Sequence, residues 1–366
     1  MSPTLVVRVI LLALGTLSAI AHWFLPRLTR PDLYFAVTVA PEFRDSSEGR
    51  FILRRYRRGL IGVSALTLTL LGALVVTPAF PLAPLALLLQ LGAYFAVYYR
   101  ARRLVLPHAL APTTIREARV GTRNRKIPGG WVTASGPFAL LVACASYLGT
   151  HWQQIPARLV LHWGAHGQPD RWAARSLGTV FLPVLVAAVI LLPLTLILYG
   201  MAHWLRPIYA GGPQGERESR FRRTASTVLL VMEYWIAVLF SGLAIRPLLP
   251  ASLQRPPAAI FMVAGLIAIA GTAVLMRLGQ GGNRVPSPQR PDSDSTRPVG
   301  DRTEDRFWKL GVFYFNRNDP SVMVERRFGI GYTVNFAHPI AWIIILLPVL
   351  ALIAVTTTIT VRHTMR

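Results

Sequence analysis

The sequence predicts an all-α integral membrane protein, with about eight transmembrane helices and a small cytoplasmic aromatic module before the last helix. Hydrophobic residues make up 53% of the 366 residues, charged residues make up only 15%, and the mean hydropathy is +0.44. Soluble domains carry about 25% charged residues, so this composition argues against an ordinary soluble enzyme. Long apolar runs predict membrane-spanning helices, and the alternating distribution of arginine between the connections predicts on which side of the membrane each connection lies.

Eight apolar stretches are long enough to cross a bilayer, because a spanning helix needs about 20 such residues at about 1.5 Å each. They cover 4–25, 59–79, 81–99, 131–150, 177–201, 225–245, 257–276 and 339–361. Only a proline-rich turn separates the second stretch from the third, which predicts a tight hairpin of two helices. Proline also lies within the spans, at Pro137, Pro183, Pro193 and Pro348, where it usually marks a kink.

The basic residues alternate between the two sides of the predicted bundle. The chain has 39 basic residues against 16 acidic ones, and 31 of the basic residues lie in four connections: 26–58, 100–130, 202–224 and 277–338. Because cytoplasmic loops are enriched in Lys and Arg, this pattern predicts that these connections are cytoplasmic and that both termini are extracytoplasmic. Spread over four loops, the charge favours anionic lipid as a partner and argues against nucleic acid.

The first span has a competing interpretation as a cleaved signal peptide. Arg8, the apolar run after it, and Ala19-Ile20-Ala21 resemble a weak signal with a cleavage site. Cleavage would move every later loop to the other side and reverse the charge pattern. We therefore expect an uncleaved membrane anchor.

Spans and loops together predict five segments along the chain. These are an N-terminal three-helix membrane region with basic cytoplasmic loops (1–130), a helix-loop-helix membrane domain (131–201), two further transmembrane helices (202–277), a linker (278–306), and a cytoplasmic module with the last helix (307–361). The linker is rich in Gly, Pro, Ser, Asp and Arg, a composition that cannot bury enough apolar surface to become ordered. We expect it to be disordered.

The predicted external segment 151–176 concentrates histidine and tryptophan. His151, His162, His166 and Asp170 are residue types that suit zinc or copper. However, Gly164, Gly167 and Pro169 argue against the regular helix that would align them. A structured external loop with an aromatic rim of Trp152, Trp163 and Trp172 is the preferred interpretation, and we expect no metal and no cofactor.

This segment resembles an uncharacterised bacterial membrane domain, in which a His–aromatic pair is followed by a G-x-P-D turn and a basic residue before the next helix. The resemblance covers roughly 135–200, and the signature residues within it begin at Ile155-Pro156. The candidate residues for a ligand or for the structure of the loop are His162, Trp163, Gly167, Pro169, Asp170, Arg171 and Arg175. Gly164 stands where the family usually has Asn or Asp. The domain also occurs in proteins resembling the immunity protein against the sporulation-delaying toxin, which implies a bacterial cell (inner) membrane and a protective or signalling role.

A second resemblance covers 307–338, immediately before the last span. This segment is similar to another small domain of unknown function, a short aromatic cytoplasmic module joined to a terminal membrane helix. The residues that carry the resemblance include Trp308, Gly311, Tyr314, Asn316, Asp319, Pro320, Arg327, Gly329, Gly331 and Asn335. Neither family has a settled activity that could be carried over to this chain, and the protective role rests on the association of the first domain alone.

Residue types in this module predict a compact cap on the cytoplasmic face of the bundle. The bulky and aromatic residues from Trp308 to Phe315 favour an extended strand, and 316–320 is a strong turn. Gly329 and Gly331 permit a positive φ or a close approach of the backbone. Two glycines without a following helix are only a weak signal for a phosphate-binding loop.

Glu233 is the one acidic residue inside a predicted span. It lies ten residues beyond Arg223, roughly 15 Å into a hydrocarbon core about 30 Å thick. An ionised acid inside the membrane costs free energy, so such residues are candidates for functional sites. The structural alternative is a protonated Glu233 that is hydrogen-bonded to a neighbouring helix. Small or polar residues share its helical face and predict an inward-facing stripe: Ser226, Glu233, Ala237, Ser241 and Ala244.

Three functions are compatible with these features. The preferred one is a non-catalytic multi-pass membrane protein that senses, binds or gives immunity to an external peptide or similar ligand. The alternatives are a proton- or ion-coupled transporter using Glu233, and a membrane metalloenzyme using the external histidines. Since no nucleophile–base pair or carboxylate pair of catalytic spacing is evident, we expect no enzyme activity. With a single cysteine, Cys144, the chain cannot form an intrachain disulfide.

Overall fold

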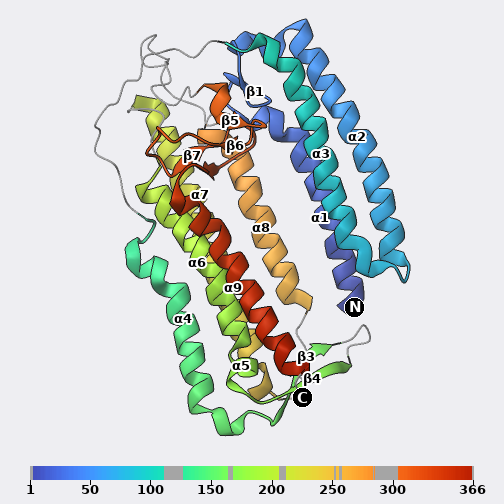
Figure 1. Ribbon diagram of the computed structural model, residues 1–366, viewed down its shortest axis with the longest axis vertical. Coiled ribbons are helices and arrows are strands. Elements are labelled where there is room, and N and C mark those ends of the chain that lie inside the picture. Colours follow the sequence, from blue (N-terminus) through green and yellow to red (C-terminus); the bar gives the residue numbers. More distant parts are fainter. Residues whose placement is uncertain are drawn as a thin grey trace.

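Long helices dominate the computed structural model, and short β-hairpins lie at both of its ends (Figure 1). The structure describes residues 3–110, 127–163, 168–205, 212–250, 253–254, 258–282, 284 and 304–364. Its α-helices are α1 (Pro3–Leu28), α2 (Ser47–Val76), α3 (Ala83–Val105), α4 (Gly130–Thr150), α5 (Leu177–Val180), α6 (Leu182–His203), α7 (Gly212–Ile245), α8 (Ala258–Leu278) and α9 (Pro339–Thr364).

Each predicted apolar stretch lies within or largely overlaps one of the long helices. In the described part of the chain, six helices are long and apolar enough to cross a membrane, namely α1, α2, α3, α4, α6 and α7. The other two stretches form α8, of 21 residues, and α9, of 26 residues. Two helices begin well before their apolar stretches, α2 at Ser47 and α7 at Gly212, because polar residues extend the helix beyond its apolar part.

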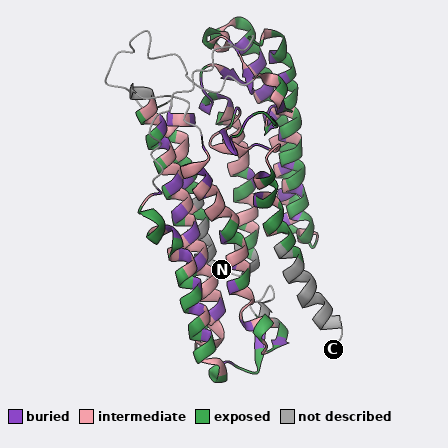
Figure 2. Cartoon of the chain, turned by 60° about the vertical axis from the view of Figure 1, so that its left-hand side comes forward, coloured by how far each residue is buried: buried purple, intermediate pink, exposed green. Residues whose placement is uncertain are grey.

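The long helices form two groups. Helix α2 packs against α1 and α3, whereas α6 packs against α4, α7 and α9. Helix α8 contacts both α7 and α1 and therefore joins the groups (Figure 1). The outward faces of the helices are largely exposed (Figure 2), and they carry large apolar side chains such as Leu66 and Val142. Exposed apolar faces of this extent are what a bilayer would cover.

In the part of the chain that the structure describes, four two-stranded antiparallel sheets accompany the helices. The strands are β1 (Leu33–Tyr34), β2 (Val37–Thr38), β3 (Arg158–Trp163), β4 (Pro169–Ala174), β5 (Trp308–Lys309), β6 (Phe313–Tyr314), β7 (Met323–Glu325) and β8 (Tyr332–Val334). Short 3-10 helices lie between the helices and strands, including η1 (Pro41–Asp45), η7 (Gln280–Gly282) and η8 (Asp305–Phe307). We call residues 305–338 the cap, and the end of the bundle that carries them the cap end. The β3–β4 hairpin lies at the opposite end (Figure 1).

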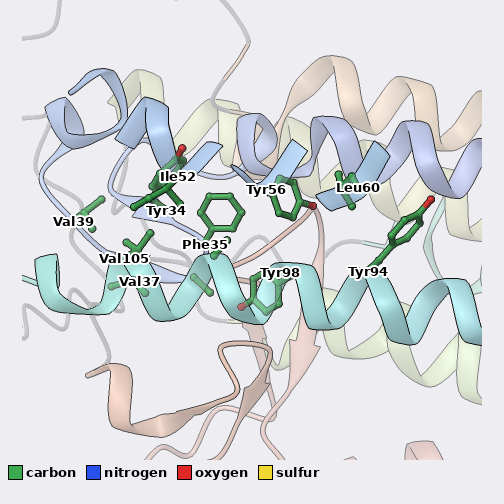
Figure 3. Close-up of a cluster of buried hydrophobic side chains, with 12 residues drawn as sticks. Tyr34, Phe35, Val37, Val39, Ile52, Tyr56, Leu60, Tyr94, Tyr98 and Val105 are labelled. Atoms are coloured by element: carbon green, nitrogen blue, oxygen red, sulfur yellow. The ribbon is translucent and has the colours of Figure 1, made fainter. Parts of the chain in front are cut away.

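An aromatic core lies at the cap end, between the β1–β2 hairpin, α2 and α3 (Figure 3). Phe35 is completely buried among Tyr34, Tyr56 and Tyr98. Phe35 and Ala36 form the two-residue turn of the hairpin, both with positive φ, of 44° and 62°. The sequence predicted only a basic loop over 26–58, because tight turns of this kind normally contain Asn or Gly.

The cap contains two hairpins, β5–β6 and β7–β8. One isolated β-bridge, between Tyr314 and Asn335, joins them, and another joins Met323 to Leu205, just after α6. The prediction of one extended strand from Trp308 to Phe315 is wrong. Leu310 and Gly311 both have positive φ and reverse the chain between β5 and β6. Gly311 packs so closely on Tyr98 and Arg102 of α3 that a Cβ atom would collide with them. The chain turns there because it meets α3.

The predicted disordered linker, 278–306, begins and ends in ordered structure. Gln280 in η7 is only 1% exposed, and η8 opens the cap at Asp305. The composition of the linker did not reveal this, because the partners of η7 come from distant parts of the chain. Residues 283 and 285–303 lie outside the described residues.

Candidate functional site

The β3–β4 hairpin contains the segment in which histidine and aspartate are concentrated. Backbone pairing sets His162 opposite Arg171 and Trp163 opposite Pro169, with irregular register between these pairs. His162 and Asp170 therefore lie on neighbouring strands and not on one face of a helix. His166 and Gly167 lie outside the described residues, as do the side chains of His162, Trp163 and Asp170. The described residues on either side, 158–163 and 169–174, form strands and not the regular helix that the glycines and Pro169 argued against.

Arg175 links this hairpin to the segment that follows α4. Its Nη1 donates hydrogen bonds to the carbonyl oxygens of Trp152, at 2.9 Å, and Ile155, at 2.8 Å. The guanidinium also lies over the Trp152 ring, 5.6 Å from its centroid, and the Arg175 backbone N–H donates to Ala157. Charge-assisted bonds of this kind are among the stronger hydrogen bonds in proteins. The basic residue of the predicted motif thus has a structural role.

One face of the hairpin packs on the bundle and the other face is open. The cross-strand pair Leu159 and Ala173 is buried against the helix ends. On the open face, Trp172 of β4 is 50% exposed, and Arg158 of β3, two residues from the Val160 that pairs with Trp172, is exposed as well. Arg171, next to Trp172 along β4, is also exposed. An exposed indole with a guanidinium group on the neighbouring strand is suited to contact a ligand with apolar and acidic groups.

The remaining histidine of the segment, His151, lies at the end of α4 and is half-buried. Its Nδ1 is 2.9 Å from the carbonyl oxygen of Tyr147, and the two ring centroids are 4.1 Å apart, with the rings tilted by 32°. Among the residues that the structure describes, no three His, Cys, Asp or Glu side chains gather closely enough to hold a metal ion.

Glu233 lies between α7 and α6 and is completely buried. One carboxylate oxygen accepts a hydrogen bond from Thr195 at 3.2 Å, while the other has no hydrogen-bond partner within the described part of the chain. Its predicted neighbours Ser226, Ala237 and Ala244 are buried as well, so the inward-facing stripe is present. A buried carboxylate oxygen without a partner is costly and marks Glu233 as a candidate for proton or cation binding.

The C-terminal module residues build a buried polar network inside the cap. Tyr314 donates to Asp319 at 2.8 Å and accepts from Asn316 at 3.1 Å. Asn335 donates to the carbonyl oxygens of Asn316 and Asp319 and accepts from the Asn316 N–H. All four side chains are at most 3% exposed. Asp319 also accepts from the Ser321 N–H, which forms the turn predicted at 316–320, with Pro320 exposed beside it.

The other module residues hold the cap together and attach it to the bundle. Arg327 is paired with Asp305 and lies over the ring of the buried Trp308. Gly331, with φ of 100°, exchanges two hydrogen bonds with the Gln280 side chain, at 2.6 and 2.9 Å. Gly329, with φ of 91°, lies against Leu25 of α1. These residues are structural, and none of them forms a catalytic pair with another.

A charged cluster that sequence reasoning missed joins the cap to both helix groups. Arg30, after α1, forms ion pairs with Glu325 of β7 and with Asp32, each at 3.3 Å. The pKa of Glu325 is raised to about 7, mainly by burial, which outweighs the lowering effect of Arg30; the neighbouring Glu218 of α7 contributes to the rise. Because Arg30 and Glu325 are 295 positions apart, no local pattern could indicate the pairing.

Arg102 was also missed. It is 5% exposed, and its Nη1 donates to the carbonyl oxygens of Phe35 and Ala36, at 3.4 and 2.7 Å. It thus holds the strained turn of the β1–β2 hairpin against α3. In the sequence it is one of several arginines near the end of an apolar span, and nothing distinguishes it from its exposed neighbour Arg103.

Comparison with known proteins identifies two matching segments. Residues 139–187, which include the β3–β4 hairpin, match a domain of unknown function (DUF1648). Residues 317–342, within the cap and the start of α9, match a family of unknown function (DUF5808). No curated protein matches the chain, and no solved structure does either.

Proposed function

We propose that this chain is a bacterial inner-membrane protein with eight spans, whose cap is cytoplasmic and whose termini and β3–β4 hairpin are outside. The distribution of arginine supports this orientation. In addition, the first and last helices begin and end at the same end of the bundle as the hairpin (Figure 1), as an even number of crossings requires. The cytoplasmic arginines would then face anionic lipid.

We further propose that the hairpin senses, binds or gives protection against an external peptide, without catalysis. The observation that carries this proposal is the open face of the hairpin, on which Trp172 and Arg158 are exposed, with Arg171 exposed next along β4, while Arg175 is bonded to the segment before the hairpin. Rigid aromatic and guanidinium anchors contribute much of the energy of binding sites. The expected ligand is a peptide with acidic and apolar side chains.

Survival of cells exposed to a panel of such peptides tests the proposal. Cells that express the protein should survive one peptide that kills cells lacking the gene. Trp172→Ala and Arg171→Ala should lose this protection, whereas the control Arg317→Ala, an exposed arginine of the cap, should keep it. Equal amounts of each variant in the membrane must be verified by immunoblot. Equal survival with and without the gene, for every peptide, would dispose of the proposal.

A second candidate function is supported by Glu233. A buried carboxylate between two helices, with one oxygen unpaired among the described residues, is suited to take up a proton or a cation during transport. In proteoliposomes, Glu233→Gln should abolish a pH-dependent ion flux, while Glu216→Gln, an exposed acid at the start of α7, should leave it intact. Native protein that carries no flux would exclude this function.

A further inference from the structure

A pocket of about 360 Å³ lies at the cap end, enclosed by α1, α3, α8 and the cap. Leu25 of α1, Phe95 of α3 and Met276 of α8 contribute apolar walls, and Phe328 and Gly329 close it from the cap. Its volume is within the range of about 300–1,000 Å³ that is typical of pockets for small ligands. Neither the hairpin nor Glu233 belongs to it, so the pocket is independent of both proposed activities.

The polar side chains of the pocket are few, and only one of them carries a full charge. His22 and Tyr94 lie together on α1 and α3, with ring centroids 4.7 Å apart, and Tyr98 of α3 and Thr272 of α8 contribute hydroxyl groups. Arg326, from the cap, is exposed, and no acidic group among the described residues pairs with it. The backbone N–H of Arg326 donates to Gly331, which fixes the loop that carries this arginine. The pocket is thus an apolar slot with one unneutralised positive charge.

The position of the pocket indicates where its ligand comes from. Its helical walls belong to the ends of spans, since α1 ends at Leu28 and α8 at Leu278. Leu91 and Phe95, which line it from α3, are 48% and 37% exposed on a surface that a bilayer would cover. An amphiphile that already lies in the bilayer can therefore reach the slot from the side.

We propose that this pocket holds an anionic phospholipid, with its phosphate at Arg326 and one acyl chain in the slot between α1, α3 and α8. A guanidinium group binds phosphate through charge-assisted hydrogen bonds, and burial of acyl methylenes against the apolar walls is favourable in free energy. The lipid would join α1 and α3 to α8 beneath the cap. The proposal requires a membrane protein, but it requires no external ligand.

Native mass spectrometry of the full chain, released from nanodiscs, tests the assignment. From nanodiscs that contain phosphatidylglycerol, the wild type should retain one molecule of this lipid, and from phosphatidylcholine alone it should retain none. Arg326→Gln should weaken retention about tenfold or more, in line with the loss of a charge-assisted bond. Thr272→Trp, which fills the slot from α8, should abolish it.

Matched controls separate the pocket from general effects of charge or folding. Arg317→Gln removes an exposed arginine elsewhere on the cap, and Ala273→Trp adds an indole to α8 outside the pocket; both should retain the lipid. Arg326→Lys should restore most of the retention, and this excludes misfolding as the cause. Equal retention by wild type and Arg326→Gln would overturn the proposal, as would equal retention of phosphatidylcholine. Binding of free glycerophosphate as tight as that of the lipid would overturn it too, since the slot would then contribute nothing.

Discussion

Asn335 connects the turn at 316–319 to the residues just before α9 through one buried side chain. Its amide donates to the carbonyl oxygens of Asn316 and Asp319 and accepts from the N–H groups of Asn316 and Ala337. Asn316 and Asp319 are buried with it, so water cannot replace the bonds to them, whereas Ala337 is half-buried. An amide side chain is required because only Asn and Gln combine donors and an acceptor in this geometry.

We expect Asn335→Ala to destabilise the cap by about 1–3 kcal/mol for each buried partner that is left unpaired. Hydrogen exchange of the cap amides, followed by mass spectrometry, measures this loss. Asn318→Ala is the matched control, because Asn318 is exposed and uses only its backbone N–H in the turn. Equal exchange in both variants would mean that the network does not stabilise the cap.

Glu325 makes the stability of the cap dependent on pH. Its pKa is about 7 in the folded protein, above the ordinary value of 4.5, mainly because of burial, and the charged groups around it are Arg30, Asp32 and Glu218. A raised pKa means that the folded cap prefers the protonated carboxyl. This contribution to stability is complete below about pH 4.5 and is lost as the pH rises through about 7.

The cap should therefore exchange its amide hydrogens more readily, after correction for intrinsic rates, as the pH rises from 4.5 to 7. Glu325→Gln should flatten this dependence, because an amide cannot lose a proton in this range. Glu304→Gln, which removes a largely exposed acid of the same segment, should leave it unchanged. A pH profile of Glu325→Gln that matches the wild type would assign the dependence to another group.

At the scale of single residues, the sequence predicted those roles that depend on neighbouring positions. Asn316, Asp319 and Pro320 lie within five residues of one another, and the turn they form was predicted. The partners of Arg30 and Arg102 are distant in the chain, so their roles became evident only in the folded structure. Side-chain pairing across long sequence separations leaves no local pattern.

The β3–β4 hairpin depends on a few contacts at its base, of which Arg175 makes the most specific. Arg175→Gln should loosen the hairpin, since it removes two charge-assisted bonds worth about 1.5–3 kcal/mol each. Limited proteolysis of the reconstituted protein should then cut within 158–174 faster than in the wild type. Arg158→Gln changes an exposed arginine of the same hairpin and should not alter the rate. Identical cleavage rates for Arg175→Gln and wild type would mean that packing alone fixes the hairpin.

Element boundaries were predicted less well than the elements themselves. Hydropathy locates the apolar part of each helix, but α2 continues toward its N-terminus through a basic, amphipathic stretch to a cap at Ser46, whose side chain accepts from the Gly49 N–H. The β1–β2 and β5–β6 hairpins were missed because residues with positive φ in their turns, Phe35, Ala36 and Leu310, are not turn formers. Packing against α3 holds both turns in place.

For the whole molecule, the apolar content alone predicted the fold class, since repeated runs of about 20 apolar residues leave few alternatives. The division into two helix groups was not predictable, because apolar spans carry no sequence signal for which neighbour they pack against. The orientation in the membrane is a prediction from the distribution of arginine, and it is open to direct measurement.

Labelling of single cysteines on intact cells measures this orientation. In a Cys144→Ser background, Gln168→Cys in the hairpin should react with a membrane-impermeant maleimide, while Ala109→Cys after α3 should react only after the cells are permeabilised. Both positions are exposed, so access to them depends on the side of the membrane. The reverse labelling pattern would invert the topology and remove the external hairpin on which the first proposed function depends.

The pairing of Arg30 with Glu325 also has a consequence for biosynthesis. A ribosome adds about 5–20 residues per second, so the 295 positions between these partners correspond to about 15 s or more of translation. During that time the first helices are inserted while Arg30 still lacks this acid. The nascent chain can complete its cap end only when almost all of it has been translated, and a chaperone or lipid phosphate that shields the arginine in the interval would favour correct assembly.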